Sequence, residues 1–254
     1  MIIIDNDYIN TIPVLHVVDS NKQNQPLPTV VYMHGFTSAK EHNLPFAYLM
    51  AQKGFRVLLP DCKLHGERAN QVSGLKLQLE FWDIVSQNLK EIQIIKENIE
   101  NKGLLLDDRF GLAGTSMGGI TTSAALTLYP WIKVAAVLMG SPKATEMANY
   151  TIHQVKEQKV KLPYTDEELQ AQVDSLRPID LSQNMHKLNN RPLLFWHGDA
   201  DKVVPFEQSY SFYQEAKAFY DMEDKLKFIR EKGRAHKVSR PAVLETVKWF
   251  ETYL

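Results

Sequence analysis

The feature that most constrains this fold is the regular alternation of short apolar segments with longer amphipathic ones. Thr29–Met33 (TVVYM) is continuously apolar or β-branched, as in a strand buried on both faces. Between about Leu79 and Lys102, apolar residues recur every three or four positions, which predicts a long helix. Such alternation predicts an α/β fold with a mainly parallel sheet and helices on both faces. The same patterns predict strands at Phe55–Leu59, Arg109–Ala113, Val134–Met139, Pro192–Trp196 and Leu226–Ile229, and helices at Pro45–Lys53, Met117–Leu128, Phe206–Tyr220 and Pro241–Leu254.

The N-terminal segment departs from this alternation. Ile2–Ile4 and Pro13–Val18 are apolar stretches separated by polar turn residues, which predicts an antiparallel pair at a sheet edge. No linker rich in Gly, Pro or Ser divides the chain, so we expect one domain over residues 1–254.

Residues 142–190 form a second departure, because they are rich in Lys, Glu and Gln and contain no strand-like run. Short helices are predicted at Glu146–Gln158 and from the capping box Thr165-x-x-Glu168. The segment is too long for an ordinary connection, so it is either a helical lid or a solvent-facing excursion. We favour a small helical lid inserted into the domain.

Composition excludes several classes of protein. The chain has 254 residues and a formal net charge of −1, so it lacks the basic footprint of a nucleic-acid binder. The N-terminus MIIIDNDYIN has neither the basic region nor the apolar length of a signal peptide, and no stretch approaches a membrane span. The single cysteine, Cys62, excludes an intramolecular disulfide. We therefore expect a cytoplasmic protein without a membrane span, with Cys62 as a packed residue.

The most informative string is Gly114-Thr115-Ser116-Met117-Gly118-Gly119, between a predicted strand and a predicted helix. A serine at such a turn projects above the sheet, and the glycines on either side remove side chains that would collide as the chain reverses. The helix that follows directs its free N–H groups toward the same point, which favours a developing oxyanion. Ser116 is therefore a candidate nucleophile.

A serine hydroxyl needs a histidine base and usually a carboxylate to orient it. His197-Gly198-Asp199-Ala200-Asp201 follows a predicted strand and places two acids at the sheet edge where sites of open α/β folds lie. Gly233-Arg234-Ala235-His236 follows the last predicted strand. The order Ser116, Asp201, His236 matches one known order of nucleophile, acid and base.

With these motifs the whole chain resembles the α/β-hydrolase family, and within it small serine carboxylesterases and prolyl-oligopeptidase-like catalytic domains. The resemblance implies a sheet of about eight strands, acyl transfer to water through an acyl-serine intermediate, and neither a metal nor an organic cofactor. The matching features are His34-Gly35-Phe36, Asp61 through His65-Gly66, the turn at Ser116, the stretch HGDADKVVP that begins at His197, and Gly233-x-x-His236.

The resemblance also implies roles for single residues. The backbone N–H groups of Phe36 and Met117 would form the oxyanion hole, and His34 would shape its loop. Of the two acids, Asp201 stands two residues before Val203-Val204-Pro205, as in the family pattern, and Asp199 is expected to hold a turn.

Other interpretations of these residues are weaker. His34, His42 and His65 lack the spacing of a metal site, and the glycines around Ser116 match neither a dinucleotide nor a P-loop motif. We therefore expect a serine hydrolase that acts on small-molecule carboxylic esters. A peptidase or thioesterase on the same scaffold, or a non-catalytic ligand-binding protein, are the alternatives.

Overall fold

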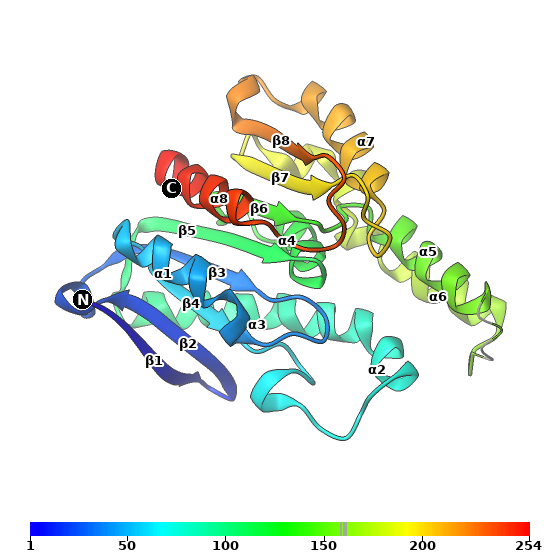
Figure 1. Cartoon of the computed structure of the whole chain (residues 1–254), viewed down its shortest axis with the longest axis horizontal. Helices are drawn as coiled ribbons and strands as arrows, with labels where there is room; N and C mark the ends of the chain where they lie inside the picture. Colours follow the sequence, from blue (N-terminus) through cyan, green and yellow to red (C-terminus); the bar gives the residue numbers. More distant parts are fainter. Residues whose placement is uncertain (158, 160–161) are drawn as a thin grey trace.

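The computed structural model describes residues 1–157, 159 and 162–254, and its centre is a single eight-stranded sheet (Figure 1). The strand order is β1-β2-β4-β3-β5-β6-β7-β8, in which the six strands from β4 to β8 run parallel. Strands β1 and β2 are antiparallel at one edge, as predicted. The strands are β1 Ile2–Ile9, β2 Ile12–Asp19, β3 Leu27–Met33, β4 Arg56–Pro60, β5 Leu105–Thr115, β6 Val134–Leu138, β7 Leu193–Gly198 and β8 Leu226–Glu231.

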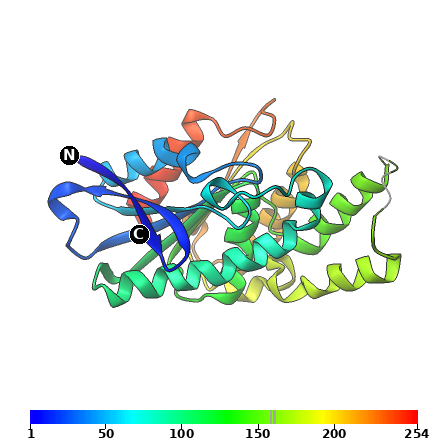
Figure 2. The same cartoon turned by 90° about the horizontal axis from the view of Figure 1, so that it is seen from below.

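The central strands are buried on both faces because helices cover each side of the sheet. Along β3, Val31 and Met33 face one core cluster, while Val30 and Tyr32 face the other. The first cluster is covered by α3 (Phe81–Asn101), α4 (Met117–Leu128) and α7 (Phe206–Ala216), and the second by α1 (Leu44–Gln52) and α8 (Arg240–Tyr253). Figures 1 and 2 show these two layers. The predicted α/β-hydrolase fold is confirmed.

Element ends differ from the sequence predictions for local reasons. The helix expected from about Leu79 is α3, which begins at Phe81, and a separate short helix α2 (Leu75–Leu79) that was not predicted precedes it, with Glu80 between the two. Strand β6 stops at Leu138 because Met139 has a φ of 43°. The helix expected to reach Tyr220 ends at Ala216 and continues as a 3-10 turn.

The segment 142–190 contains α5 (Ala144–Glu157) and α6 (Asp166–Ser175), followed by short 3-10 turns. The predicted capping box is present, since Thr165 and Glu168 each accept a hydrogen bond from the other's backbone N–H. Gln158, the predicted end of the first helix, lies outside the described residues. The two helices extend past the carboxyl ends of the parallel strands (Figures 1 and 2). Among the described residues, no helix has the length and apolarity needed to cross a bilayer.

Candidate active site

Ser116 stands on a strained turn between β5 and α4. Its backbone has φ 54° and ψ −115°, a conformation that residues other than glycine rarely adopt and that is found mainly at functional sites. A Cβ at Gly118 would lie 2.0 Å from the carbonyl oxygen of Met33, and one at Gly114 would lie 2.3 Å from the Gly118 backbone. The two glycines therefore let β3, β5 and α4 approach closely enough to form the turn.

Hydrogen bonds hold this turn in place. The Ser116 N–H donates to the carbonyl oxygen of Leu138 at 2.9 Å, which ties the turn to β6. Ile120 N–H donates to the Ser116 carbonyl oxygen at 2.9 Å and begins the hydrogen-bond ladder of α4. The positive end of the α4 dipole therefore lies at Ser116.

The structure brings Ser116, His236 and Asp201 together. His236 Nε2 lies 2.9 Å from Ser116 Oγ, and His236 Nδ1 lies 2.6 Å from Asp201 Oδ2. Because a carboxylate only accepts, Nδ1–H donates to Asp201, and a neutral ring then offers Nε2 as the acceptor for the serine hydroxyl. The arrangement can move a proton away from Ser116 Oγ.

Asp201 is held as a buried carboxylate, and its side chain is 0% exposed. Oδ1 accepts the N–H groups of Val203 and Val204, at 2.8 and 3.1 Å. Burial alone would raise the pKa of this carboxyl, but the hydrogen bonds from His197, His236 and the Val203 N–H outweigh it and lower the pKa below its ordinary value. Asp201 therefore stays charged beneath the imidazole.

Asp199 faces away from this group. Its carboxylate accepts from Arg230 Nε at 2.8 Å and from the Gly233 N–H at 2.6 Å, so it ties β8 and the following turn to the loop after β7. The structure thus places Asp201, and not Asp199, against His236.

The sequence marks His197 only as the start of the stretch HGDADKVVP and indicates no role for it; the residue lies at the end of β7 and is almost fully buried. Its Nε2 lies 3.2 Å from Asp201 Oδ2 and 3.1 Å from the Val204 carbonyl oxygen. Both neighbours are acceptors, so Nε2 carries a proton and donates to them. The available signal was its spacing of four residues before Asp201 on the same strand-to-loop turn.

A second loop approaches Ser116 from β3. His34 Nε2 accepts the Cys62 N–H at 3.0 Å, which leaves Nδ1–H to donate to the Gly35 carbonyl oxygen at 2.8 Å. Burial is the main reason that the pKa of His34 falls to about 4, so the ring is neutral. Its placement fits the predicted loop-shaping role.

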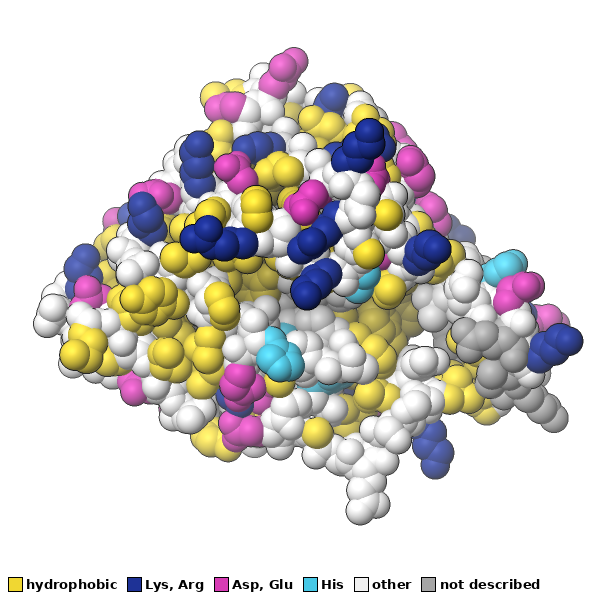
Figure 3. Space-filling model, viewed as in Figure 1, with side chains coloured by type: hydrophobic (Ala, Val, Ile, Leu, Met, Phe, Trp, Pro, Cys, Tyr) yellow, Lys and Arg dark blue, Asp and Glu magenta, His cyan; other side chains and the backbone are white. Residues whose placement is uncertain are grey.

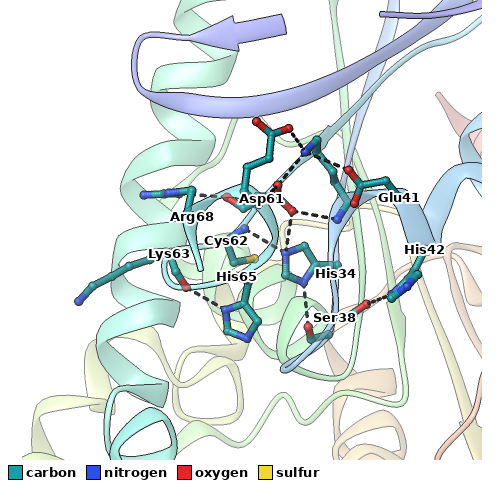
Figure 4. Close-up of polar contacts among 12 residues, drawn as sticks. His34, Ser38, Glu41, His42, Asp61, Cys62, Lys63, His65 and Arg68 are labelled. Atoms are coloured by element: carbon teal, nitrogen blue, oxygen red, sulfur yellow. Dashed lines mark hydrogen bonds and ion pairs between the residues drawn. The ribbon is translucent and has the colours of Figure 1, made fainter. Parts of the chain in front are cut away.

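Two further contacts tie the β3 loop to the loop after β4, and Figure 4 shows Asp61 and Cys62 of the second loop beside His34 of the first. His65 Nε2 accepts the Thr37 N–H at 2.9 Å. Asp61 accepts from the Lys40 N–H at 3.0 Å and from Lys40 Nζ at 2.8 Å. The two loops are therefore joined at three points, which hold the backbone between His34 and Lys40 in place.

Phe36 lies within this tied segment, and Met117 is the first residue of α4. Among the described residues, neither backbone N–H has a hydrogen-bond acceptor. The Phe36 ring lies edge-on to His65, with ring centroids 5.3 Å apart, which fixes the side chain on the loop. Both N–H groups remain available to a ligand oxygen.

The histidines of these loops do not form a metal site. Each of them has polar partners of its own, and the partner of His42 Nδ1 is Ser38 Oγ, at 2.9 Å. The described part of the chain contains no group of three or more His, Cys, Asp or Glu side chains placed to hold a metal ion. Cys62 is fully buried, and burial raises the pKa of its thiol.

A cavity of about 490 Å³ opens beside Ser116 and His236. Its walls come from the β3 loop, including Phe36 and His42, and from the start of α8. In the view of Figure 3 the surface is hollowed near its middle, and Lys and Arg side chains gather along one edge of the hollow. The volume suits a small organic molecule.

Comparisons with known proteins agree with this architecture. The model of the prolyl oligopeptidase family matches residues 45–254. The chain is 46% identical to "Putative esterase YitV" of Bacillus subtilis (strain 168) and 31% identical to "Esterase YjfP" of Escherichia coli (strain K12), in both cases over 100% of each chain. The crystal structure of TT1662 from Thermus thermophilus superposes with a TM-score of 0.77 at 20% identity, covering 99% of this chain and 98% of that one.

Proposed function

The chain belongs to the prolyl oligopeptidase family, and from this premise we propose that it hydrolyses carboxylic esters of small acyl substrates through an acyl-serine intermediate. The observation that carries the proposal is the unbroken hydrogen-bonded series from Ser116 through His236 to Asp201, with distances of 2.9 and 2.6 Å. Serine, histidine and aspartate in this relation make a nucleophilic triad.

In the proposed first half-reaction, His236 Nε2 removes the hydroxyl proton as Ser116 Oγ attacks the ester carbonyl carbon. The carbonyl oxygen becomes an oxyanion and accepts from the N–H groups of Phe36 and Met117. Loss of one such donor typically costs about 10²–10³ in turnover. Asp201 keeps the ring in the required tautomer and stabilises the imidazolium that forms.

The imidazolium then protonates the leaving alcohol oxygen, and the bond between that oxygen and the acyl carbon breaks. In the second half-reaction His236 removes a proton from water, and the resulting hydroxide attacks the acyl-serine. Collapse of the tetrahedral species returns the proton to Ser116 Oγ and releases the carboxylic acid.

A thioesterase or peptidase would use the same groups, and the names of the two sequence relatives favour ester hydrolysis. The test is kcat/KM for 4-nitrophenyl butyrate, a butyryl thioester and a butyryl 4-nitroanilide, with Ser116→Ala as the matched control. We expect the oxygen ester to be turned over fastest and the variant to lose about 10⁶ in kcat. Binding of these compounds without turnover would favour a ligand-binding protein instead.

We also propose that residues 1–254 are one domain and that 142–190 form a cap on the site. Met147 of α5 packs against Ile120 of α4 and Val204 of the Asp201 loop, and Tyr150 OH donates to the Lys202 carbonyl oxygen at 3.2 Å. The insertion therefore contacts elements that carry both the nucleophile and the acid. Met147→Ala should change KM by severalfold, and an unaltered KM for long and short acyl esters would contradict the cap.

A further inference from the structure

The cavity that contains Ser116 has an uneven distribution of charge. Among the described residues, its lining includes Lys237 and Arg240 but no Asp or Glu side chain. Both cationic side chains are exposed, and within the described residues neither has an ion-pair partner. Two unpaired positive charges thus lie in the wall of the cavity that holds the nucleophile.

Lys237 lies on the loop between β8 and α8, and the acids closest to this loop in sequence already have partners. Glu231 accepts from Ser239 Oγ at 2.6 Å and pairs with Arg234 at 3.6 Å. The neighbouring Arg230 pairs with Asp199 at 2.7 Å. Arg230 and Arg234 are therefore each paired with an acid. Lys237 and Arg240 line the cavity without such a partner among the described residues, so they can attract a negative charge from outside the chain.

The backbone that carries these two cations is fixed. Arg234 Nε donates to the Lys237 carbonyl oxygen at 2.8 Å. Ser239 Oγ accepts the Ala242 N–H at 3.2 Å and caps α8, whose first residue is Arg240. The positive end of the α8 dipole consequently adds to the same wall of the cavity.

The position of His236 decides which part of an ester meets these charges. The imidazolium must protonate the leaving oxygen, so the alcohol portion lies on the His236 side of the reacting carbon. Lys237 follows His236 directly, and Arg240 is four residues on. If the proposed ester hydrolysis holds, we propose that the preferred substrates are esters whose alcohol portion carries a negatively charged group, bound by Lys237 and Arg240.

The test compares two acetate esters that differ in one charge on the leaving group, 4-acetoxybenzoate and methyl 4-acetoxybenzoate. The readout is a ratio, kcat/KM for the charged ester divided by kcat/KM for the neutral ester, measured at low ionic strength. It is compared among the wild type, Lys237→Gln/Arg240→Gln and Lys232→Gln. Lys232 is also an exposed cation on the same loop, and it does not line the cavity. Differences in intrinsic leaving-group reactivity cancel when the ratios of two variants are compared.

We expect the double variant to lower the ratio by about tenfold, since each exposed charge pair contributes modestly. Lys232→Gln should leave the ratio at the wild-type value. Raising NaCl to 0.5 M should reduce the wild-type ratio toward that of the double variant, because salt screens exposed charges.

An equal ratio in the wild type and the double variant would overturn the inference, as would an equal fall in Lys232→Gln. A second pair, mono-4-nitrophenyl glutarate and 4-nitrophenyl butyrate, places the charge on the acyl portion instead. A larger effect of the double variant on that pair would also overturn the assignment. Failure of the wild type to cleave any of these esters would reject the proposed function itself, which separates the two outcomes.

Discussion

Replacing Lys40 with methionine would leave a buried carboxylate without its cation. The side chains of Lys40 and Asp61 are both 0% exposed, and Nζ lies 2.8 Å from Oδ2. Lys40 Nζ also contacts Glu67 and Glu41, which lie at the protein surface. Asp61 in turn accepts the backbone N–H groups of Lys40 and Glu67, at 3.0 Å each, so the pair joins the β3 loop to the loop after β4.

The expected cost is about 3–5 kcal/mol of unfolding free energy, the range for removing one partner of a buried ion pair. Methionine has a similar volume, so the change leaves almost no cavity and the cost is mainly electrostatic. A protein domain has only about 5–15 kcal/mol of stability, so the variant should unfold at a much lower urea concentration.

The loss should depend on pH. Burial would raise the pKa of Asp61, but hydrogen bonds from Lys40 and the backbone hold it below its ordinary value. Without the ammonium that pKa rises, so in Lys40→Met the carboxyl takes up a proton at a higher pH and ceases to be an unpaired charge. The cost of the substitution should therefore be larger at pH 7 than at pH 4.5.

Urea unfolding followed by circular dichroism measures this cost. The matched control is Lys53→Met, because Lys53 pairs with Glu251 at 3.0 Å while both side chains are about half exposed, and its loss should cost less than about 1 kcal/mol. Lys40→Met/Asp61→Asn removes both charges and should recover part of the loss. A Lys40→Met variant no less stable than Lys53→Met would refute the reasoning.

Two other predictions concern a buried histidine and the choice of acid. The pKa of His34 is about 4 in the folded protein against 6.5 for the free side chain. The free energy of unfolding is therefore unaffected by the titration of this group above pH 6.5 and should fall by about 3 kcal/mol as the pH is lowered from 6.5 to 4. Urea unfolding between these pH values should show that loss, and a flat profile would contradict it. Asp201→Asn should lower kcat for an ester by about 10⁴, whereas Asp199→Asn should retain most of it, because the Asp199 carboxylate contacts Arg230 and Gly233 instead of the imidazole. Equal losses of kcat in the two variants would reject the assignment.

The fold could be predicted from the sequence because its signals are local. Each buried parallel strand is a short apolar run, and the amphipathic period of α3 repeats over many turns. The separate short helix α2 before Glu80 could not be predicted in this way, since apolar residues continue from α2 into α3 and do not mark the break. Helix ends depend on tertiary contacts as well as on periodicity.

The residues of the candidate site could be proposed because motif and chain order select them. Their partners depend on contacts between distant segments. Lys40 reads as an ordinary exposed lysine, yet it is buried against Asp61, 21 residues away. The cavity wall formed by Lys237 and Arg240 likewise depends on how α8 meets the β3 loop. Spacing along the chain does not carry that information.

Covalent labelling tests the central claim most directly. The native protein would be treated with a fluorophosphonate, and its intact mass and the modified peptide would be determined, with Ser116→Ala and heat-unfolded protein as controls. The account predicts one adduct per chain, located on Ser116 and missing from both controls. A native protein that stays unlabelled, or an adduct on another serine that persists in Ser116→Ala, would contradict it.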